Sequence, residues 1–204
     1  SYAEIKMLAT GNPYIKEKMD LDIQVQKLKL LKSNFLSEKY SLEDKIIKYY
    51  PQRIASMHSR IEGLKADVKT AQEHPKPTDD RFAGMEVKGV FYTEKAEAGK
   101  AIIEACKEMN SPDPVPLGAY RGFTTELLFD TVERQYVVRL KGETSRNVPL
   151  GEDIHGNITR IDNGIERFEE MLKGAENDLE NTEKQFETAK AEAEKPFSKE
   201  EELK

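Results

Sequence analysis

The feature that most constrains this sequence is an unbroken apolar repeat near its C-terminal end. Apolar or small side chains recur there in steps of three and four residues, at Ile158, Ile161, Ile165, Phe168, Leu172, Ala175, Leu179, Thr182, Phe186, Ala189 and Ala193. Such a heptad stripe follows one face of a helix and is typical of coiled coils. At 1.5 Å per residue the helix would be roughly 50 Å long. We therefore expect a helical arm, with Asn157 as its N-cap and Pro196 just after its end.

The N-terminal part carries a matching repeat. Five apolar positions lie seven residues apart, at Leu21, Leu28, Phe35, Leu42 and Tyr49. A second stripe follows at Ile54, Met57, Ile61, Leu64, Val68 and Ala71. Pro51 lies between the stripes, and its missing N–H and its ring predict a kink or break near residue 50. We expect helices over residues 14–49 and 52–73, then a proline-containing loop over residues 74–80.

The middle of the chain has a different pattern. Residues 85–92 resemble a short hairpin that turns at Lys88 and Gly89, and Thr93 is the predicted N-cap of a helix over residues 94–109. Alternating apolar residues then predict strands over residues 119–129 and 134–141, with a further strand over residues 144–150. These elements predict an antiparallel sheet of four or five strands with one helix packed across it.

Together these patterns predict an α+β fold in three parts: an N-terminal helical arm over residues 1–80, a small α+β head over residues 81–151, and a C-terminal helical arm over residues 152–204. The formal charges of the three parts are +2, 0 and −8. Because apolar stripes avoid water, we expect the two arms to pair as a long antiparallel coiled-coil hairpin that carries the head as an insertion. The alternative is a homodimer through the same stripes, and a monomer is the preferred interpretation.

The composition of the 204 residues is polar, with 37% apolar and 34% charged side chains. No run of 18 apolar residues is present, so no membrane partner is expected. Cys106 is the single cysteine, which excludes an internal disulfide and favours the reducing cytoplasm. The first residue is Ser1 rather than methionine, and we interpret the chain as a piece of a longer protein.

A search for catalytic motifs yields no catalytic, cofactor-binding or metal-binding residues. The phosphate-loop pattern is absent, and His58, His74 and His155 are scattered without ligand spacing. Cys106 lies on the predicted apolar face of its helix, where an inert core thiol is expected. The turn at Asn12 and Pro13 has one proline where an adenine-methyltransferase loop has two, so it is interpreted as a helix start. The chain itself is therefore not expected to be an enzyme.

Two neighbouring predicted strands combine aromatic and cationic side chains. The candidate nucleic-acid contacts are Tyr120, Arg121, Phe123, Arg134, Tyr136, Arg139 and Lys141. Such a mixture can stack on bases and neutralise phosphates. The alternative is that the aromatic rings form the core and the cations face water. The net charge of −6 provides little long-range attraction to DNA.

Several segments resemble a known bacterial family. They are SYAEIKMLATGNPYIKEKMDLD at residues 1–22, IIKYYP at 46–51, SPDPVPLG at 111–118, YRGF at 120–123 and EAEKPF at 192–197. They are similar to a segment of very large proteins of conjugative and other mobile elements, which join an adenine-specific DNA methyltransferase-like region to a Snf2-like, DEAD/DEAH-type helicase. The resemblance implies a place after the helicase core, in the bacterial cytoplasm, in a parent protein that acts on DNA. None of the family's catalytic motifs falls within this chain.

Three functional hypotheses follow. The first is a non-catalytic accessory module that positions DNA or other domains of the parent helicase-methyltransferase. The second is a direct nucleic-acid-binding module that uses the sheet face. The third is a protein-interaction or dimerisation coiled coil, suggested by the length of the apolar stripes.

Overall fold

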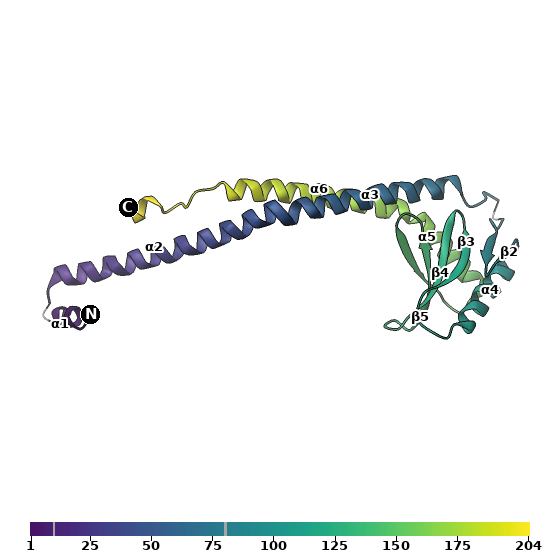
Figure 1. Ribbon diagram of the computed structural model, residues 1–204, viewed down its shortest axis with the longest axis horizontal. Coiled ribbons are helices and arrows are strands. Elements are labelled where there is room, and N and C mark those ends of the chain that lie inside the picture. Colours follow the sequence, from purple (N-terminus) through teal and green to yellow (C-terminus); the bar gives the residue numbers. More distant parts are fainter. Residues whose placement is uncertain (10, 80) are drawn as a thin grey trace. The chain divides into compact units, whose positions relative to one another are not determined.

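The computed structural model describes residues 1–9, 11–79 and 81–204, and its fold is α+β (Figure 1). Two compact units are present. The first unit comprises Ser1–Ile54 together with Asn181–Lys204, and the second comprises Ala55–Glu180. The division into three parts at residues 80 and 151 stays a prediction. Within the described residues, no helix combines the length and the apolar character that crossing a membrane requires.

The N-terminal helices are α1 (Tyr2–Leu8) and α2 (Pro13–Asp44). Asn12 caps α2, because its side-chain oxygen accepts a hydrogen bond from the backbone N–H of Tyr14 at 3.1 Å. Pro13 occupies the first turn, where its missing N–H costs no helical hydrogen bond. The interpretation of Asn12 and Pro13 as a helix start is therefore confirmed.

Where a kink or break was predicted near Pro51, the helix continues with a local change of helical pitch. A π-helical turn, η1 (Lys45–Tyr49), connects α2 directly to α3 (Tyr50–Glu73). Pro51 cannot donate a backbone hydrogen bond, and the chain accommodates this with a wider turn in which the N–H of Tyr50 bonds to the carbonyl of Lys45. The chain is thus helical from Pro13 to Glu73, and the prediction of two separate helices was wrong.

In the first unit, aromatic contacts join the N-terminal helices to the C-terminal residues. The rings of Phe35 and Phe197 have centroids 5.5 Å apart, and Tyr50 stacks on Phe186 at 5.2 Å. The ammonium of Lys32 lies 2.7 Å from the carboxylate of Glu200. Phe186 belongs to α6 (Phe168–Ala193), which ends before Pro196 as predicted, and a short 3-10 helix, η2 (Glu201–Leu203), follows.

The second unit contains a six-stranded, fully antiparallel sheet. Its strands are β1 (Met85–Val87), β2 (Val90–Tyr92), β3 (Val115–Tyr120), β4 (Phe123–Asp130), β5 (Gln135–Lys141) and β6 (Ser145–Pro149). Their order in the sheet is β2-β1-β3-β4-β5-β6. The hairpin turn at Lys88 and Gly89 is confirmed, whereas the single strand over residues 119–129 is wrong. A second tight turn at Arg121 and Gly122 divides it, and the sheet therefore has more strands than predicted.

Two helices contribute to the core beside the sheet: α4 (Lys95–Glu108) and α5 (Ile154–Glu166) (Figure 1). Both predicted N-caps were wrong. The cap of α4 is Glu94 rather than Thr93. Asp153 caps α5, since its carboxylate accepts hydrogen bonds from the backbone N–H groups of His155 and Gly156.

The core of the second unit draws on α3, the sheet, α4, α5 and the start of α6. Its largest fully buried side chains are Tyr120, Phe123, Phe168, Leu64, Met85, Ile102, Leu117, Leu127, Leu140, Ile158, Ile161 and Ile165. Leu64 and Ile165 lie in the same cluster although about a hundred residues separate them. The first turns of the C-terminal stripe are therefore covered by the sheet domain, which the prediction of a single helix across the sheet did not anticipate.

Candidate functional site

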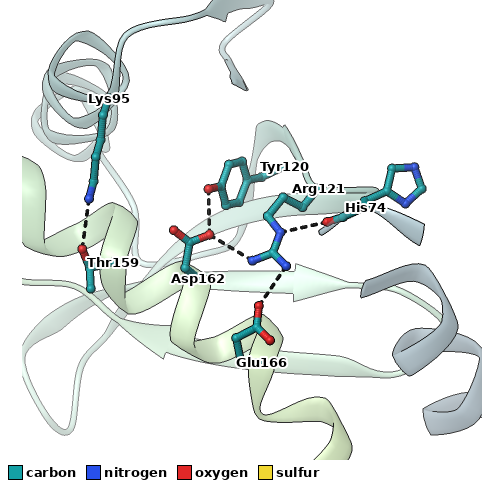
Figure 2. A network of polar contacts seen from close by, with 7 residues as sticks. All are labelled: His74, Lys95, Tyr120, Arg121, Thr159, Asp162 and Glu166. Atoms are coloured by element: carbon teal, nitrogen blue, oxygen red, sulfur yellow. Dashed lines mark hydrogen bonds and ion pairs between the residues drawn. The ribbon is translucent and has the colours of Figure 1, made fainter. Parts of the chain in front are cut away.

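A buried polar network lies at the turn between β3 and β4 in the second unit (Figure 2). The hydroxyl of Tyr120 donates to Asp162 Oδ1 at 2.7 Å, and Arg121 Nη1 donates to the same oxygen at 3.1 Å. Arg121 Nη2 donates to Glu166 at 2.9 Å. Both carboxylates come from α5, so the network links the hairpin turn to that helix.

The conformation of the turn directs Arg121 into the interior. Arg121 and Gly122 have φ values of +46° and +82°, the left-handed pair that tight two-residue hairpins require. Arg121 Nε donates at 2.9 Å to the backbone carbonyl of His74, which follows the last turn of α3 and would otherwise lack a helical partner. A Cβ on Gly122 would lie 2.7 Å from His74 Nδ1, so glycine allows the turn to approach α3 closely.

The electrostatic environment explains why the guanidinium can be buried. The side chain of Arg121 is only 2% exposed and that of Asp162 only 9%, whereas Glu166 is 64% exposed. Arg121 therefore has one buried and one solvated counter-charge, which offset part of the cost of removing it from water. Burial, and then the negative charge and hydrogen bond of Asp162, raise the pKa of the Tyr120 hydroxyl well above its usual value.

This geometry positions secondary structure. Asp162 accepts two hydrogen bonds, Tyr120 is held as a neutral donor, and Arg121 joins α3, β3 and α5 through three partners. A further contact, from Lys95 Nζ to Thr159 Oγ1 at 3.2 Å, links α4 to α5 (Figure 2). The network therefore fixes the sheet against the helices around it.

Three of the predicted nucleic-acid contacts lie in the interior, so that role does not fit their placement. Tyr120 and Phe123 are at most 2% exposed, and the ring of Phe123 stacks on Phe168 at 5.1 Å. Buried rings cannot stack on bases, and the charge of Arg121 is used by Asp162 and Glu166. The sequence pattern was misleading because the turn at Arg121 and Gly122 places these residues at the edge of the core.

The other predicted contacts are divided between the two sheet faces and a turn. Arg139 and Lys141 of β5 lie on the sheet face opposite the helices, and both pair with Glu126 of β4, at 3.6 and 2.9 Å. Arg134 is exposed in the turn before β5, and the ring of Tyr136 packs edge-on against Phe129 at 5.0 Å. The seven predicted residues therefore form no common surface.

The remaining candidates for a chemical role are the thiol of Cys106 and possible metal-binding side chains. Cys106 lies in the core as predicted, and burial raises the pKa of its thiol to about 11, which disfavours the reactive thiolate. Across residues 1–9, 11–79 and 81–204, no group of three or more histidine, cysteine, aspartate or glutamate side chains is placed to hold a metal ion.

A second polar site, which the sequence patterns did not indicate, lies between β6 and α5. Arg146 of β6 and Arg160 of α5, together with Arg167 at the C-cap of α5, line a hollow of 270 Å³. Gly164 allows this close approach, since a Cβ there would lie 2.6 Å from a methyl group of Val148. Arg160 and Arg167 are seven residues apart, so the sequence could have placed these two of the three arginines on one face of a helix. We call this site the arginine hollow.

Comparison of the chain with protein-family models, curated proteins and solved structures found no match. The functional assignment therefore depends on the geometry described above and on the sequence resemblance.

Proposed function

We propose that this chain is a non-catalytic accessory module, in which paired helical arms carry an α+β head. The observation that supports this most directly is the network at Arg121. Its charged side chains and the hydroxyl of Tyr120 hold β3 and β4 against α3 and α5. A domain whose polar interior serves rigidity is suited to hold other parts in place.

The pairing of the arms as an antiparallel coiled coil is part of this proposal. In the first unit, Phe35 contacts Phe197 and Tyr50 contacts Phe186. The later residue of the N-terminal helices therefore contacts the earlier residue of the C-terminal segment. In the second unit, Gln72 of α3 donates to Glu169 of α6 at 3.3 Å. These pairs support an antiparallel register between the N-terminal and C-terminal helices.

The particular parent that we propose is a DNA helicase-methyltransferase protein of a bacterial mobile element, as the sequence resemblance implies. In it, the module would position DNA or a neighbouring domain relative to the helicase motor. Two measurements test this. The coding sequence around the 204 residues should contain helicase motifs upstream, and the purified chain should neither hydrolyse ATP nor transfer methyl groups. Either activity in the isolated chain would contradict the proposal.

A protein-interaction arm is a second candidate, and exposed apolar side chains on α2 favour it. Leu21, Ile23, Leu30 and Leu31 are between 45% and 62% exposed. Exposed apolar side chains on a helix are often covered by another protein surface, here a second copy or another domain of the parent. Light scattering of the purified chain at several concentrations tests self-association. A mass that stays at 23.3 kDa throughout would exclude the homodimer.

Direct DNA binding through the open sheet face has less support, because Glu126 neutralises part of the charge of Arg139 and Lys141. Fluorescence anisotropy with double-stranded DNA at low salt tests it. The substitution Lys141→Gln should weaken binding if this face is the interface, and equal binding by both proteins would exclude it.

A further inference from the structure

The arginine hollow is lined by three arginines, and no acidic side chain is among its lining residues. Besides Arg146, Arg160 and Arg167, the polar residues that line it are Asn147 and Asn163. In the described part of the chain, no carboxylate pairs with any of the three arginines within 4.0 Å. Arg121, in contrast, pairs with two carboxylates, those of Asp162 and Glu166.

The three side chains also have unused hydrogen-bonding capacity. Each guanidinium carries five N–H donors. Arg146 Nη1 contacts the sulfur of Met171 at 2.8 Å, and its buried Nε atom has no hydrogen-bond partner among the described residues. Arg160 Nη1 donates to Asn157 at 3.0 Å. A buried, unpartnered donor of a charged group is costly. Arg160 and Arg167 are exposed, so they are the arginines that a ligand in the hollow reaches directly.

The positive charges of Arg146 and Arg167 repel each other in the absence of a ligand. Burial first, and then the positive charge of Arg167, lower the pKa of Arg146, whereas the negative charge of Glu170 acts in the opposite direction. Glu170 does not line the hollow. The hollow is therefore a region of positive potential that a bound anion would stabilise.

We propose that the arginine hollow binds a phosphate group. Guanidinium forks match the oxygens of phosphate and can bind it with paired hydrogen bonds, and phosphate carries enough negative charge to offset several arginines. The volume of 270 Å³ is several times the roughly 30 Å³ that a water molecule occupies, so the space admits such a group. The phosphate could come from a nucleic-acid backbone or from a free phosphate compound. The proposal is independent of the accessory-module function, because it concerns a different face of α5.

The test is a titration of the full 204-residue chain with sodium phosphate at constant ionic strength. NMR of the arginine Nε–Hε signals monitors each step of the titration. We expect saturable shifts for Arg146, Arg160 and Arg167. Arg167→Gln should weaken phosphate binding about tenfold, since it removes one charged donor. Arg60→Gln is the matched control, because it removes the same charge from an exposed position on α3 outside the hollow and should change nothing.

A second arm distinguishes the sources of the phosphate. Anisotropy with a labelled single-stranded oligonucleotide should show binding that weakens as salt rises, and Arg167→Gln should reduce the salt slope by about 1, if the ligand is a nucleic-acid backbone. Saturable binding of phosphate without oligonucleotide binding would instead assign a free phosphate compound.

Three results would overturn the proposal. They are the absence of saturable shifts with phosphate, an equal loss of binding in Arg60→Gln and Arg167→Gln, and equal affinity for acetate, which would indicate a carboxylate ligand. Thermal melting of each variant checks that the fold is retained. Arg160→Gln provides a second variant if Arg167→Gln fails to fold, with the same expected loss.

Discussion

Apolar repeats of the same kind are fully buried in one region of this protein and only partly covered in another. In the second unit, Ile158, Ile161 and Ile165 are at most 1% exposed, because the sheet and α4 pack over them. In the first unit, Leu21 and Tyr49 belong to the same kind of repeat and are 53% and 51% exposed, whereas Leu28, Phe35 and Leu42 are half-buried. A heptad stripe therefore identifies the apolar face of a helix, and only its neighbours decide whether that face is removed from water.

The comparison also predicts where stability resides. Full burial of a leucine or isoleucine side chain is worth about 1.5–3 kcal/mol, and most such side chains lie in the second unit. The first unit depends on a few ring contacts, such as that between Tyr50 and Phe186. We expect the second unit to unfold as a cooperative domain and the helices of the first unit to open more easily.

The largest effect is expected at Asp162, in the interior of the second unit. Asp162→Ala removes the shared acceptor of Tyr120 and Arg121 and leaves a buried guanidinium with only a solvated partner. The free energy of unfolding should fall by about 4 kcal/mol, measured by urea denaturation. Glu166→Ala, at the exposed end of the network, should cost less than about 1 kcal/mol. Equal losses would show that the burial of Asp162 has no energetic consequence.

A matched pair of leucines tests the comparison itself. Leu64→Ala should lower the free energy of unfolding by about 3 kcal/mol, because it creates a cavity in the core of the second unit, where Leu64 is fully buried. Leu21→Ala makes the same chemical change at an exposed position and should stay within about 0.5 kcal/mol of the unmodified protein. Circular dichroism during urea unfolding measures both. A similar loss for Leu21→Ala would mean that a partner or second copy covers α2 in solution.

A smaller, local effect is expected in the first unit. Phe186 stacks on Tyr50, and the ammonium of Lys190 lies 3.9 Å from the centre of its ring. Phe186→Ala should weaken the local structure by about 1 kcal/mol. Amide hydrogen exchange over residues 181–193 should become roughly fivefold faster, while the strands of the second unit stay unchanged. Faster exchange in the sheet as well would contradict the independence of the two units.

The smallest effect concerns reactivity rather than stability. Burial raises the pKa of the Cys106 thiol to about 11, so at pH 8 roughly one molecule in a thousand carries the thiolate. Alkylation by iodoacetamide should be slow in the folded protein and should rise about tenfold per pH unit between pH 8 and 10. Urea-unfolded protein, with an ordinary cysteine pKa, provides the control. Equal rates for the two states would show that the core around Cys106 is open.

Local patterns predicted many of the individual elements. The hairpin turn at Lys88 and Gly89, the helix start at Asn12 and the end of α6 before Pro196 each depend on residues within a few positions of one another. The predicted N-caps at Thr93 and Asn157 failed, because Glu94 and Asp153 begin the helices instead. Several polar residues can begin a helix within one turn, and packing selects among them.

The candidate sites could not be predicted in this way. Arg121 contacts Asp162 and Glu166 across more than forty residues of sequence, and Arg146 lines the same hollow as Arg160 and Arg167 only because β6 and α5 pack together. The mixture of aromatic and cationic residues at 120–123 left two interpretations open, either an exposed binding surface or aromatic rings in the core with the cations facing water. The tight turn at Arg121 and Gly122 places most of that segment in the core.

The sequence by itself determined that this protein has long amphipathic helices and a central group of short strands, because helix and strand periods are set by neighbouring residues. Tertiary structure alone decided which stretches of the apolar repeats are buried. It also decided that Arg121 pairs with two carboxylates and that Arg146, Arg160 and Arg167 line one hollow. The physical reason is that burial and charge pairing depend on surfaces contributed by distant parts of the chain. Spacing along the sequence carries no information about which of those surfaces will meet.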